Sequence, residues 1–513
     1  MASYDGLVST VLWAIFVIQV IEFGHSNSST NVSCIGAERE ALLKFKHGLI
    51  DPSRRLSSWT GEECCKWEGV ECNKKTGHVL KLDVRSMFIP SDNSMSMLGG
   101  NIVPSLTNLK YLKYLDLSGN NFSTQKIPMF FASLQKLEYL NLSYAGFDGD
   151  IPRQLNNLSK LQYLDLSSDF YMGHLTSNDF DWVSKLSSLK YLHMYGVDLY
   201  KVKDCGDLPN RFRDFKELEY LALSRNMIFG SIPANLVELS SLESLYLDHN
   251  KLNGIIPKSI GQLSNLKELY LGNNLLCGVV GELHFENLKS LTGLDISSNK
   301  LILNMSSAWV PPFQIREIDL SDCKVGPEFP KWLQTQRNVT VLRMSNASIL
   351  GAIPDWLYDI CSTIQTLDIS SNMLRGQVPQ DIGDKMPRLT KLSLKGNNLT
   401  GGIPNSLCKL NWLGRINLSK NQLSGKLPRC WGASQELGYL FFGDNKLNGQ
   451  IPKSLCHLQL FALSLHGNGF TGEIPNCLSN IQAMSVLDLS DNEFTGSLPP
   501  FGPQSLLEVL VYA

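Results

Sequence analysis

The chain of 513 residues has few charged side chains and no excess of either sign. Lysine and arginine number 46, aspartate and glutamate number 48, and charged residues make up only 18% of the chain. A protein that binds nucleic acid needs surplus positive charge to meet the phosphates. The composition therefore argues against a nucleic-acid partner.

Long apolar runs are absent after the first 21 residues, although a membrane-spanning helix needs about 20 apolar residues. Residues 7–21 form one shorter apolar stretch, which is followed by small and polar residues up to Ser29. This pattern predicts a signal peptide over residues 1–26 and entry into the secretory pathway. We expect no membrane span in the sequence that follows.

Catalytic motifs are also missing, since the chain has no G-x-S-x-G, no phosphate-binding P-loop and no H-E-x-x-H. A G-x-G-x-x-G string does occur at residues 467–472, but its Asn468 and Gly472 belong to an internal repeat and no βαβ unit follows. The nine histidines are scattered along the chain. We therefore expect neither an enzyme nor a bound cofactor.

Glycosylation sequons and cysteines, in contrast, are plentiful. The ten N-x-[ST] sequons begin at Asn27, Asn31, Asn121, Asn141, Asn157, Asn304, Asn338, Asn346, Asn398 and Asn417. The twelve cysteines, an even number, suit an oxidising compartment. Metal binding is the rival explanation for the four cysteines between residues 34 and 72, but it requires C-x-x-C pairs or nearby histidines, and neither is present.

Leucine recurs with a nearly fixed period along most of the chain. The middle residues of successive L-x-x-L-x-L segments, which we call anchors, are 23 to 29 residues apart: Leu115, Leu140, Leu164, Leu192, Leu221, Leu245, Leu269, Leu294, Ile318, Leu342, Leu367, Leu392, Ile416, Leu440, Leu463 and Leu487. Leu82 begins a further unit, and residues 507–512 begin one that is incomplete. Residues 78–513 are thus predicted to contain about 17 repeats of about 24 residues.

Each position of the repeat has a structural role. Alternation around the anchor predicts a short parallel strand whose leucines point inward. Five residues past most anchors stands an asparagine, whose amide can satisfy backbone groups at a tight bend, and Cys323 replaces it in one unit. A glycine and an Ile-Pro pair follow in many units. The pattern predicts a leucine-rich-repeat solenoid, an α/β repeat fold with a parallel sheet on its concave side.

The repeat resembles that of plant extracellular leucine-rich-repeat proteins, L-x-x-L-x-x-L-x-L-S-x-N-x-L-x-G-x-I-P, best seen in residues 239–265. Residues 34–77 resemble the N-terminal cap of that family, and the resemblance implies a right-handed, curved superhelix with disulfides Cys34–Cys64 and Cys65–Cys72. Residues 309–314 (WVPPFQ) and 330–333 (PKWL) further resemble receptor-like proteins of the ethylene-inducing-xylanase receptor type.

That resemblance implies the ectodomain of a plasma-membrane receptor without a kinase, active in plant defence or development. Its expected partners are an extracellular protein, peptide or glycan ligand and a co-receptor or adaptor kinase reached through parts missing here. The family also has more repeats, a C-terminal cap and a membrane span, so we expect a truncated product. Two alternatives stay open: a secreted inhibitor resembling polygalacturonase-inhibiting proteins, or a non-functional truncated product.

Tyrosines gather at outward strand positions. They precede the anchor in five consecutive units (Tyr114, Tyr139, Tyr163, Tyr191 and Tyr220) and follow it at Tyr246 and Tyr270. Such a row is either an aromatic platform for a ligand or an effect of the strand propensity of tyrosine. Glycans on Asn141 and Asn417 would limit a ligand to residues 164–392. The candidate ligand-binding residues are Tyr163, Tyr191, His193, Tyr220, Tyr246, Asp248, Tyr270, Asp319 and Arg343.

Four later cysteines occupy matched positions in neighbouring repeats. Cys408 and Cys456 lie 16 residues past their anchors, whereas Cys430 and Cys477 lie 14 past the anchors of the next units. Stacked repeats bring such positions within disulfide reach, which predicts the pairs Cys408–Cys430 and Cys456–Cys477. The remaining cysteines, predicted to be free or left unassigned, are Cys205, Cys277, Cys323 and Cys361.

Overall fold

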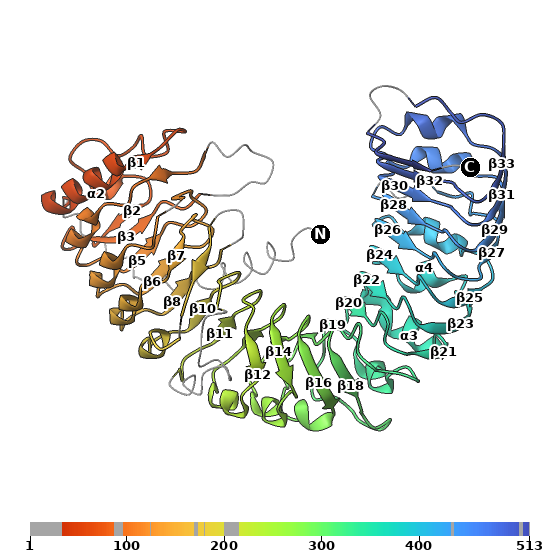
Figure 1. The fold of residues 1–513 in the computed structure, drawn as a ribbon, viewed down its shortest axis with the longest axis horizontal. Helices are drawn as coiled ribbons and strands as arrows, with labels where there is room; N and C mark the ends of the chain where they lie inside the picture. Colours follow the sequence, from red (N-terminus) through yellow and green to blue (C-terminus); the bar gives the residue numbers. More distant parts are fainter. Residues whose placement is uncertain are drawn as a thin grey trace.

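The computed structural model describes residues 33–86, 96–123, 125–168, 173–178, 180–199, 215–431, 436–501 and 506–511. The predicted signal peptide, Asn27, Asn31 and Cys205 lie outside these residues, as does the side chain of Cys361. The described chain is an open arc of stacked turns with a parallel sheet on its inner side (Figure 1). The predicted leucine-rich-repeat solenoid is confirmed.

The first turns of the arc are covered by a cap. Helix α2 (Gly36–Gly48) buries Ala41, Leu42 and Phe45, and strand β1 (Leu49–Ile50) pairs with β4 (Gly99–Gly100). The buried carboxylate of Glu38 accepts the Val79 amide at 2.7 Å, which ties the helix to the first repeat. Because each solenoid end must cover its neighbour's core, this cap shields apolar side chains from water.

The concave sheet contains 19 strands, and no pairing within the described residues joins its two ends. The strands, in spatial order, are β2 (Val70–Cys72), β3 (Val79–Asp83), β5 (Tyr114–Asp116), β6 (Tyr139–Asn141), β8 (Tyr163–Asp165), β10 (Tyr191–His193), β11 (Tyr220–Ala222), β13 (Ser244–Tyr246), β15 (Glu268–Tyr270), β17 (Gly293–Asp295), β19 (Glu317–Asp319), β20 (Val341–Arg343), β22 (Thr366–Asp368), β24 (Lys391–Ser393), β26 (Arg415–Asn417), β28 (Tyr439–Phe441), β30 (Ala462–Ser464), β32 (Val486–Asp488) and β34 (Val509–Val511). Only β2 runs antiparallel to its neighbour.

Every predicted anchor pairs with the anchor of the next repeat, for example Leu221 with Leu245 and Leu245 with Leu269. This register follows from burial, since a shift by one residue would turn the leucines outward. Residues just before and after each anchor therefore form two continuous rows on the concave face.

Shorter sheets follow the concave strands on the flank of the arc. They are β7 (Gly149–Asp150) with β9 (Leu175–Thr176); β12 (Phe229–Ser231), β14 (Lys251–Gly254), β16 (Leu275–Val280) and β18 (Lys300–Leu303); β21 (Leu350–Ala352), β23 (Met373–Gln377) and β25 (Asn398–Thr400); and β27 (Ser424–Gly425), β29 (Lys446–Gly449), β31 (Gly469–Glu473) and β33 (Glu493–Thr495). Gly254 adopts a φ of +75° at the end of β14, which explains the glycine of the repeat.

Short helices close most turns, and many begin just after the proline of the repeat. They are η1 (Cys64–Lys66), η3 (Pro104–Asn108), η4 (Met129–Ser133), η5 (Arg153–Asn157), η6 (Val183–Lys185), η8 (Ala234–Glu238), η9 (Lys258–Gln262), η10 (Glu282–His284), η11 (Lys331–Thr335), α3 (Asp355–Ile360), η12 (Cys361–Thr363), α4 (Ile382–Lys385), η13 (Asn405–Lys409), η14 (Lys453–His457) and η15 (Asn476–Asn480). No helix in the described part is long and apolar enough to cross a membrane.

The repeated asparagine holds adjacent turns together. The side-chain amide of Asn274 donates to the carbonyls of Leu247 and Leu271, both at 3.0 Å, and its carbonyl accepts the Leu252 amide at 3.0 Å. Cys323, which replaces this asparagine in its own unit, donates its thiol to the carbonyl of Ile296 at 3.2 Å. The thiol thus supplies one of the contacts that the amide makes elsewhere.

Candidate functional site

The concave face carries a continuous column of seven tyrosine rings, which we call the tyrosine stack: Tyr114, Tyr139, Tyr163, Tyr191, Tyr220, Tyr246 and Tyr270. The first five come from the row before the anchors, with ring centroids 4.0 to 4.2 Å apart and planes within 13° of parallel. The pairing of β5 through β11 in register sets this spacing, because each ring starts from the same strand position.

The stack changes rows between Tyr220 and Tyr246. Tyr220 pairs in register with Ser244, so Tyr246 on the far side of its anchor meets Tyr220 diagonally. Their centroids are 5.4 Å apart and the planes are inclined by 43°. Tyr246 and Tyr270 are again in register, with centroids 4.9 Å apart.

Stacking changes what the tyrosines offer to a ligand. The rings cover one another's faces, so Tyr163, Tyr191 and Tyr220 are half-buried rather than free-standing. Each of these residues keeps part of its surface exposed, and burial raises the pKa of Tyr163 and Tyr191 well above its ordinary value, so their hydroxyls stay neutral. A ligand on this surface therefore meets neutral hydroxyls and ring edges rather than exposed aromatic faces.

Carboxylates accompany the stack in both rows, with Asp116 after its anchor and Glu268 before its anchor. The Asp116 side chain is fully buried, and it accepts a hydrogen bond from the Tyr114 hydroxyl at 3.2 Å. The Tyr246 hydroxyl donates to Glu268, which also accepts from Ser244 at 3.1 Å. These bonds fix the orientation of the outer edge of the stack.

His193 lies beside the stack and faces Asp165, with its Nδ1 3.2 Å from a carboxylate oxygen. Burial opposes ionisation of Asp165, but His193 and the hydrogen bonds from Ser167 hold the pKa of that carboxyl below its ordinary value. The His193 ring also meets Tyr191 and Tyr220 edge-on, with centroids 6.1 and 6.0 Å away. A partly exposed imidazole is thus fixed next to the tyrosines.

A second polar group lies further along the same row, where Asp295, Asp319 and Arg343 stand on three consecutive strands. The guanidinium of Arg343 is 3.7 Å from the Asp319 carboxylate. Burial and the neighbouring Asp295 raise the pKa of Asp319 to about 6. Burial likewise raises the pKa of Asp295. This part of the face changes its charge in mildly acidic solution.

The structure divides the nine candidate residues into two groups. It brings Tyr163, Tyr191, His193, Tyr220, Tyr246 and Tyr270 together in or beside the stack, and it places Asp319 and Arg343 further along. Asp248 follows strand β13 and accepts hydrogen bonds from Ser224 at 2.6 Å and from His249. Sequence reasoning missed Asp165, Glu268 and Asp295, although Asp165 and Asp295 occupy the same repeat position as Asp319.

The sequons differ in how accessible they are. The exposed ones are Asn121, Asn157, Asn304, Asn338, Asn346 and Asn398, and Asn417 is half-buried. Asn141 departs from the expectation of an open outward position, because only 8% of it is exposed and its amide faces Asp116 and Tyr139 at 3.5 and 3.4 Å. A glycan at Asn141 would displace these contacts. The predicted ligand window began at residue 164 because a glycan was expected at Asn141, so this limit of the window loses its support.

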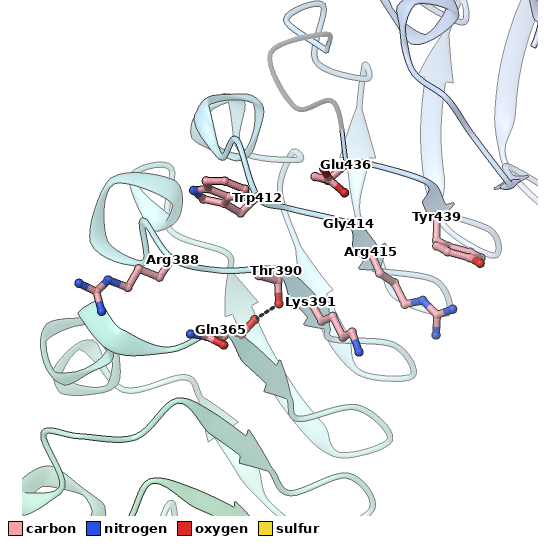
Figure 2. A pocket seen from close by; sticks show the side chains of 9 residues that line it. All are labelled: Gln365, Arg388, Thr390, Lys391, Trp412, Gly414, Arg415, Glu436 and Tyr439. Atoms are coloured by element: carbon pink, nitrogen blue, oxygen red, sulfur yellow. Dashed lines mark hydrogen bonds between the residues drawn. The ribbon is translucent and has the colours of Figure 1, made fainter. Parts of the chain in front are cut away.

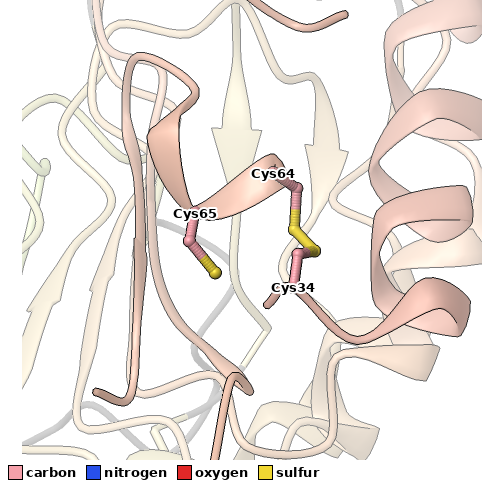
Figure 3. Close-up of side chains that lie close together, drawn as sticks. All are labelled: Cys34, Cys64 and Cys65. Atoms are coloured by element: carbon pink, nitrogen blue, oxygen red, sulfur yellow. A yellow bond between two sulfur atoms is a disulfide. The ribbon is translucent and has the colours of Figure 1, made fainter. Parts of the chain in front are cut away.

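Four disulfides join the cysteines in the predicted pairs: Cys34–Cys64, Cys65–Cys72, Cys408–Cys430 and Cys456–Cys477. The sulfurs of Cys34, Cys64 and Cys65 lie within 4.8 Å of one another (Figure 3). Metal binding needs thiolates, and these sulfurs are bonded in disulfides. Cys277 and Cys323 are free thiols, the first exposed and the second buried.

Comparison with known protein families agrees with the repeats. Residues 35–73 match the leucine rich repeat N-terminal domain, residues 169–403 match a leucine-rich repeat region, and residues 111–134 and 459–481 match single leucine rich repeats. Receptor-like protein EIX2 of Solanum lycopersicum is 30% identical over 71% of this chain and 55% of its own length. Receptor-like protein EIX1 of the same plant is 30% identical over 66% of this chain and 52% of its own length.

The chain spans about half the length of these curated relatives. Among solved structures, the ectodomain of the Arabidopsis thaliana receptor kinase GASSHO1/SCHENGEN3, in complex with CASPARIAN STRIP INTEGRITY FACTOR 2, superposes with a TM-score of 0.65 at 24% identity. The match covers 93% of this chain and 64% of that one, and it bears on the fold. The relatives are receptor-like proteins and ligand-binding ectodomains rather than enzymes. The chain therefore belongs to the leucine-rich-repeat proteins and is similar to plant receptor-like proteins.

Proposed function

We propose that this chain is the ligand-recognising part of a plant cell-surface receptor-like protein that enters the secretory pathway. Similarity to the curated relatives supports the receptor role, because they are named receptor-like proteins. Its ligand is an extracellular peptide, protein or glycan. Signalling passes to a partner kinase through regions that the relatives have in addition to the length matched here.

The observation that carries the proposal is the run of polar and aromatic groups on the concave face between β8 and β22. Aromatic edges and neutral hydroxyls occupy the part from Tyr163 to Tyr270, and charged groups occupy the part from Asp295 to Arg343. Tyrosine and arginine, together with tryptophan, are the side chains enriched where binding energy concentrates in protein interfaces. Such a surface fits an extended ligand that lies across several strands.

Cell-surface display tests this proposal. The chain is fused to a membrane anchor, displayed on plant cells and exposed to labelled extracellular peptide and protein fractions from plants and microbes. We expect saturable binding to the displayed chain, and we expect the soluble chain to compete with it. A displayed leucine-rich-repeat ectodomain of another family is expected not to bind the same fractions. Binding that is absent, or equal for the control ectodomain, would contradict a role in ligand recognition.

A further inference from the structure

A basic and aromatic surface lies at the rim of the arc beside strands β24, β26 and β28, beyond the tyrosine stack. Its principal side chains, which we call the rim patch, are Arg388, Lys391, Trp412, Arg415 and Tyr439 (Figure 2). Lys391, Arg415 and Tyr439 pair in register before their anchors, so they form one row. Arg388 and Trp412 precede the strands and line the side of the hollow opposite Lys391 and Arg415 (Figure 2).

The cations of the rim patch are available to a partner. Arg388, Lys391 and Arg415 are exposed, and no ion pair engages them within the described residues, whereas nearby Lys409 is paired with Asp384 at 2.9 Å. The Arg415 guanidinium lies 4.4 Å from the centre of the Tyr439 ring, which holds it in place without neutralising it. One acidic side chain, Glu436, lines the hollow.

Aromatic surface is exposed in the same place. Trp412 is 67% exposed, the largest exposed fraction among the large apolar side chains of the described residues. On the other side, Tyr439 packs against Phe461, which is 46% exposed, with ring centroids 5.6 Å apart. Tryptophan, tyrosine and arginine, which all occur in the rim patch, are the residue types enriched in interface hot spots.

Gly414 lines the hollow between Trp412 and Arg415 (Figure 2). Its amide donates to the Thr390 carbonyl at 2.8 Å, and a Cβ there would find its nearest neighbour at 3.5 Å, an ordinary contact. The lack of a side chain at this position keeps the hollow open, although the backbone would accept one. A larger side chain introduced at position 414 would therefore fill the hollow while leaving the charged side chains in place.

We propose that the rim patch binds an acidic segment of an extracellular protein partner, at a site distinct from the tyrosine stack. Three unpaired cations complement carboxylate side chains, and Trp412 provides an apolar contact for the segment that carries them. Adjacent strands are about 4.8 Å apart, so an extended segment that crosses β24 to β28 presents carboxylates to Lys391 and Arg415 in turn. Glu436 orients the segment by repelling its acidic groups toward Arg388 and Lys391.

The test measures binding of a short labelled oligoglutamate carrying one tyrosine to the protein secreted from cells that express the full 513-residue sequence. The Asn417→Gln background removes any glycan beside Arg415. We expect binding that weakens with added salt and falls by about tenfold or more in the triple variant Arg388→Ala, Lys391→Ala and Arg415→Ala. Trp412→Ala and the hollow-filling Gly414→Val are also expected to weaken it, with thermal stability unchanged.

Controls separate a specific site from net charge. The matched triple variant Lys258→Ala, Lys289→Ala and Lys331→Ala removes three exposed cations elsewhere and is expected to bind as the parent chain does. An oligoglutamine of equal length is expected not to bind. Equal loss in both triple variants, absence of oligoglutamate binding, or equal binding of an oligogalacturonate would each overturn the proposal, the last because it indicates a carbohydrate surface.

Discussion

Tyr163 and Tyr191 come from adjacent repeats, yet their rings lie 4.2 Å apart and within 7° of parallel. The in-register pairing of β8 with β10 produces this contact, since both residues precede their anchors by one position. Two features of the sequence, the repeat period and the residue type before the anchor, are therefore sufficient to build the stack.

The stack should contribute to stability as well as to the surface. Tyr191 has a ring on each side, so Tyr191→Ala removes two stacking contacts and is expected to lower the free energy of unfolding by about 1 to 3 kcal/mol. Tyr191→Phe keeps both contacts and should cost less than about 1 kcal/mol. Denaturant unfolding of the two variants measures the difference, and equal losses would show that the rings do not support each other.

The asparagine that bridges adjacent repeats should contribute to the stability of the fold wherever it occurs. Asn274→Ala leaves the Leu247 and Leu271 carbonyls without their buried donor, which is expected to cost about 2 to 4 kcal/mol. Asn274→Cys should cost less, because the Cys323 thiol already makes one such contact in its own repeat. Hydrogen exchange at the Leu252 amide reports the local effect. Unchanged protection in Asn274→Ala would rule out this role.

Most of the fold could be predicted from the sequence because the repeat is local and periodic. Each anchor needs only its neighbours in the next turn, and all of them pair as expected, as Leu342 does with Leu367. Matched cysteine positions likewise placed Cys408 beside Cys430. The pairing of the anchors and of the cysteines depends only on the spacing between residues. That spacing can be read directly from a single sequence.

The candidate site was less predictable because it depends on contacts between side chains. Outward position did not imply exposure for Asn141, which the neighbouring Tyr139 and Asp116 bury. Trp412, Arg415 and Tyr439 of the rim patch were missed because a predicted glycan at Asn417 ended the ligand window at residue 392. Arg388 and Trp412 lie outside the strands, in a segment where the repeat pattern does not fix side-chain direction.

The raised pKa of Asp319 makes a specific pH prediction. A carboxyl whose folded pKa of about 6 exceeds its ordinary 3.8 binds more protons when folded, so its ionisation destabilises the fold as the pH rises through 6. Relative to the parent chain, Asp319→Ala should gain about 2 kcal/mol in unfolding free energy between pH 4.5 and pH 7.5. Unfolding at both pH values measures this gain, and parallel pH profiles would contradict the assignment.

The two free thiols should react differently with an alkylating reagent. Cys277 is exposed, whereas Cys323 is buried and its burial raises the pKa of the thiol to about 12. Because the thiolate is the reactive form, native protein should be labelled at Cys277, and at Cys323 only after unfolding. Mass spectrometry of the labelled peptides checks this. Rapid native labelling of Cys323 would show that its repeat opens readily.

Recognition on the concave face is best tested by placing a new glycan there. Asp319→Asn creates a sequon with Ser321 on strand β19, and Asp319→Asn combined with Ser321→Ala makes the same charge change without a glycan. Gln262→Asn creates a sequon with Ser264 on the exposed helix η9, away from the concave strands, as a control for glycan bulk.

The decisive measurement is the affinity of these three variants for the extracellular fraction that binds the displayed parent chain. The account predicts that binding is abolished in Asp319→Asn, where the glycan covers the concave strands. Binding is only weakened in the sequon-free double variant, which loses the Asp319 charge but carries no glycan, and it is unchanged in Gln262→Asn. Unchanged binding by a fully glycosylated Asp319→Asn chain would contradict recognition on the concave face.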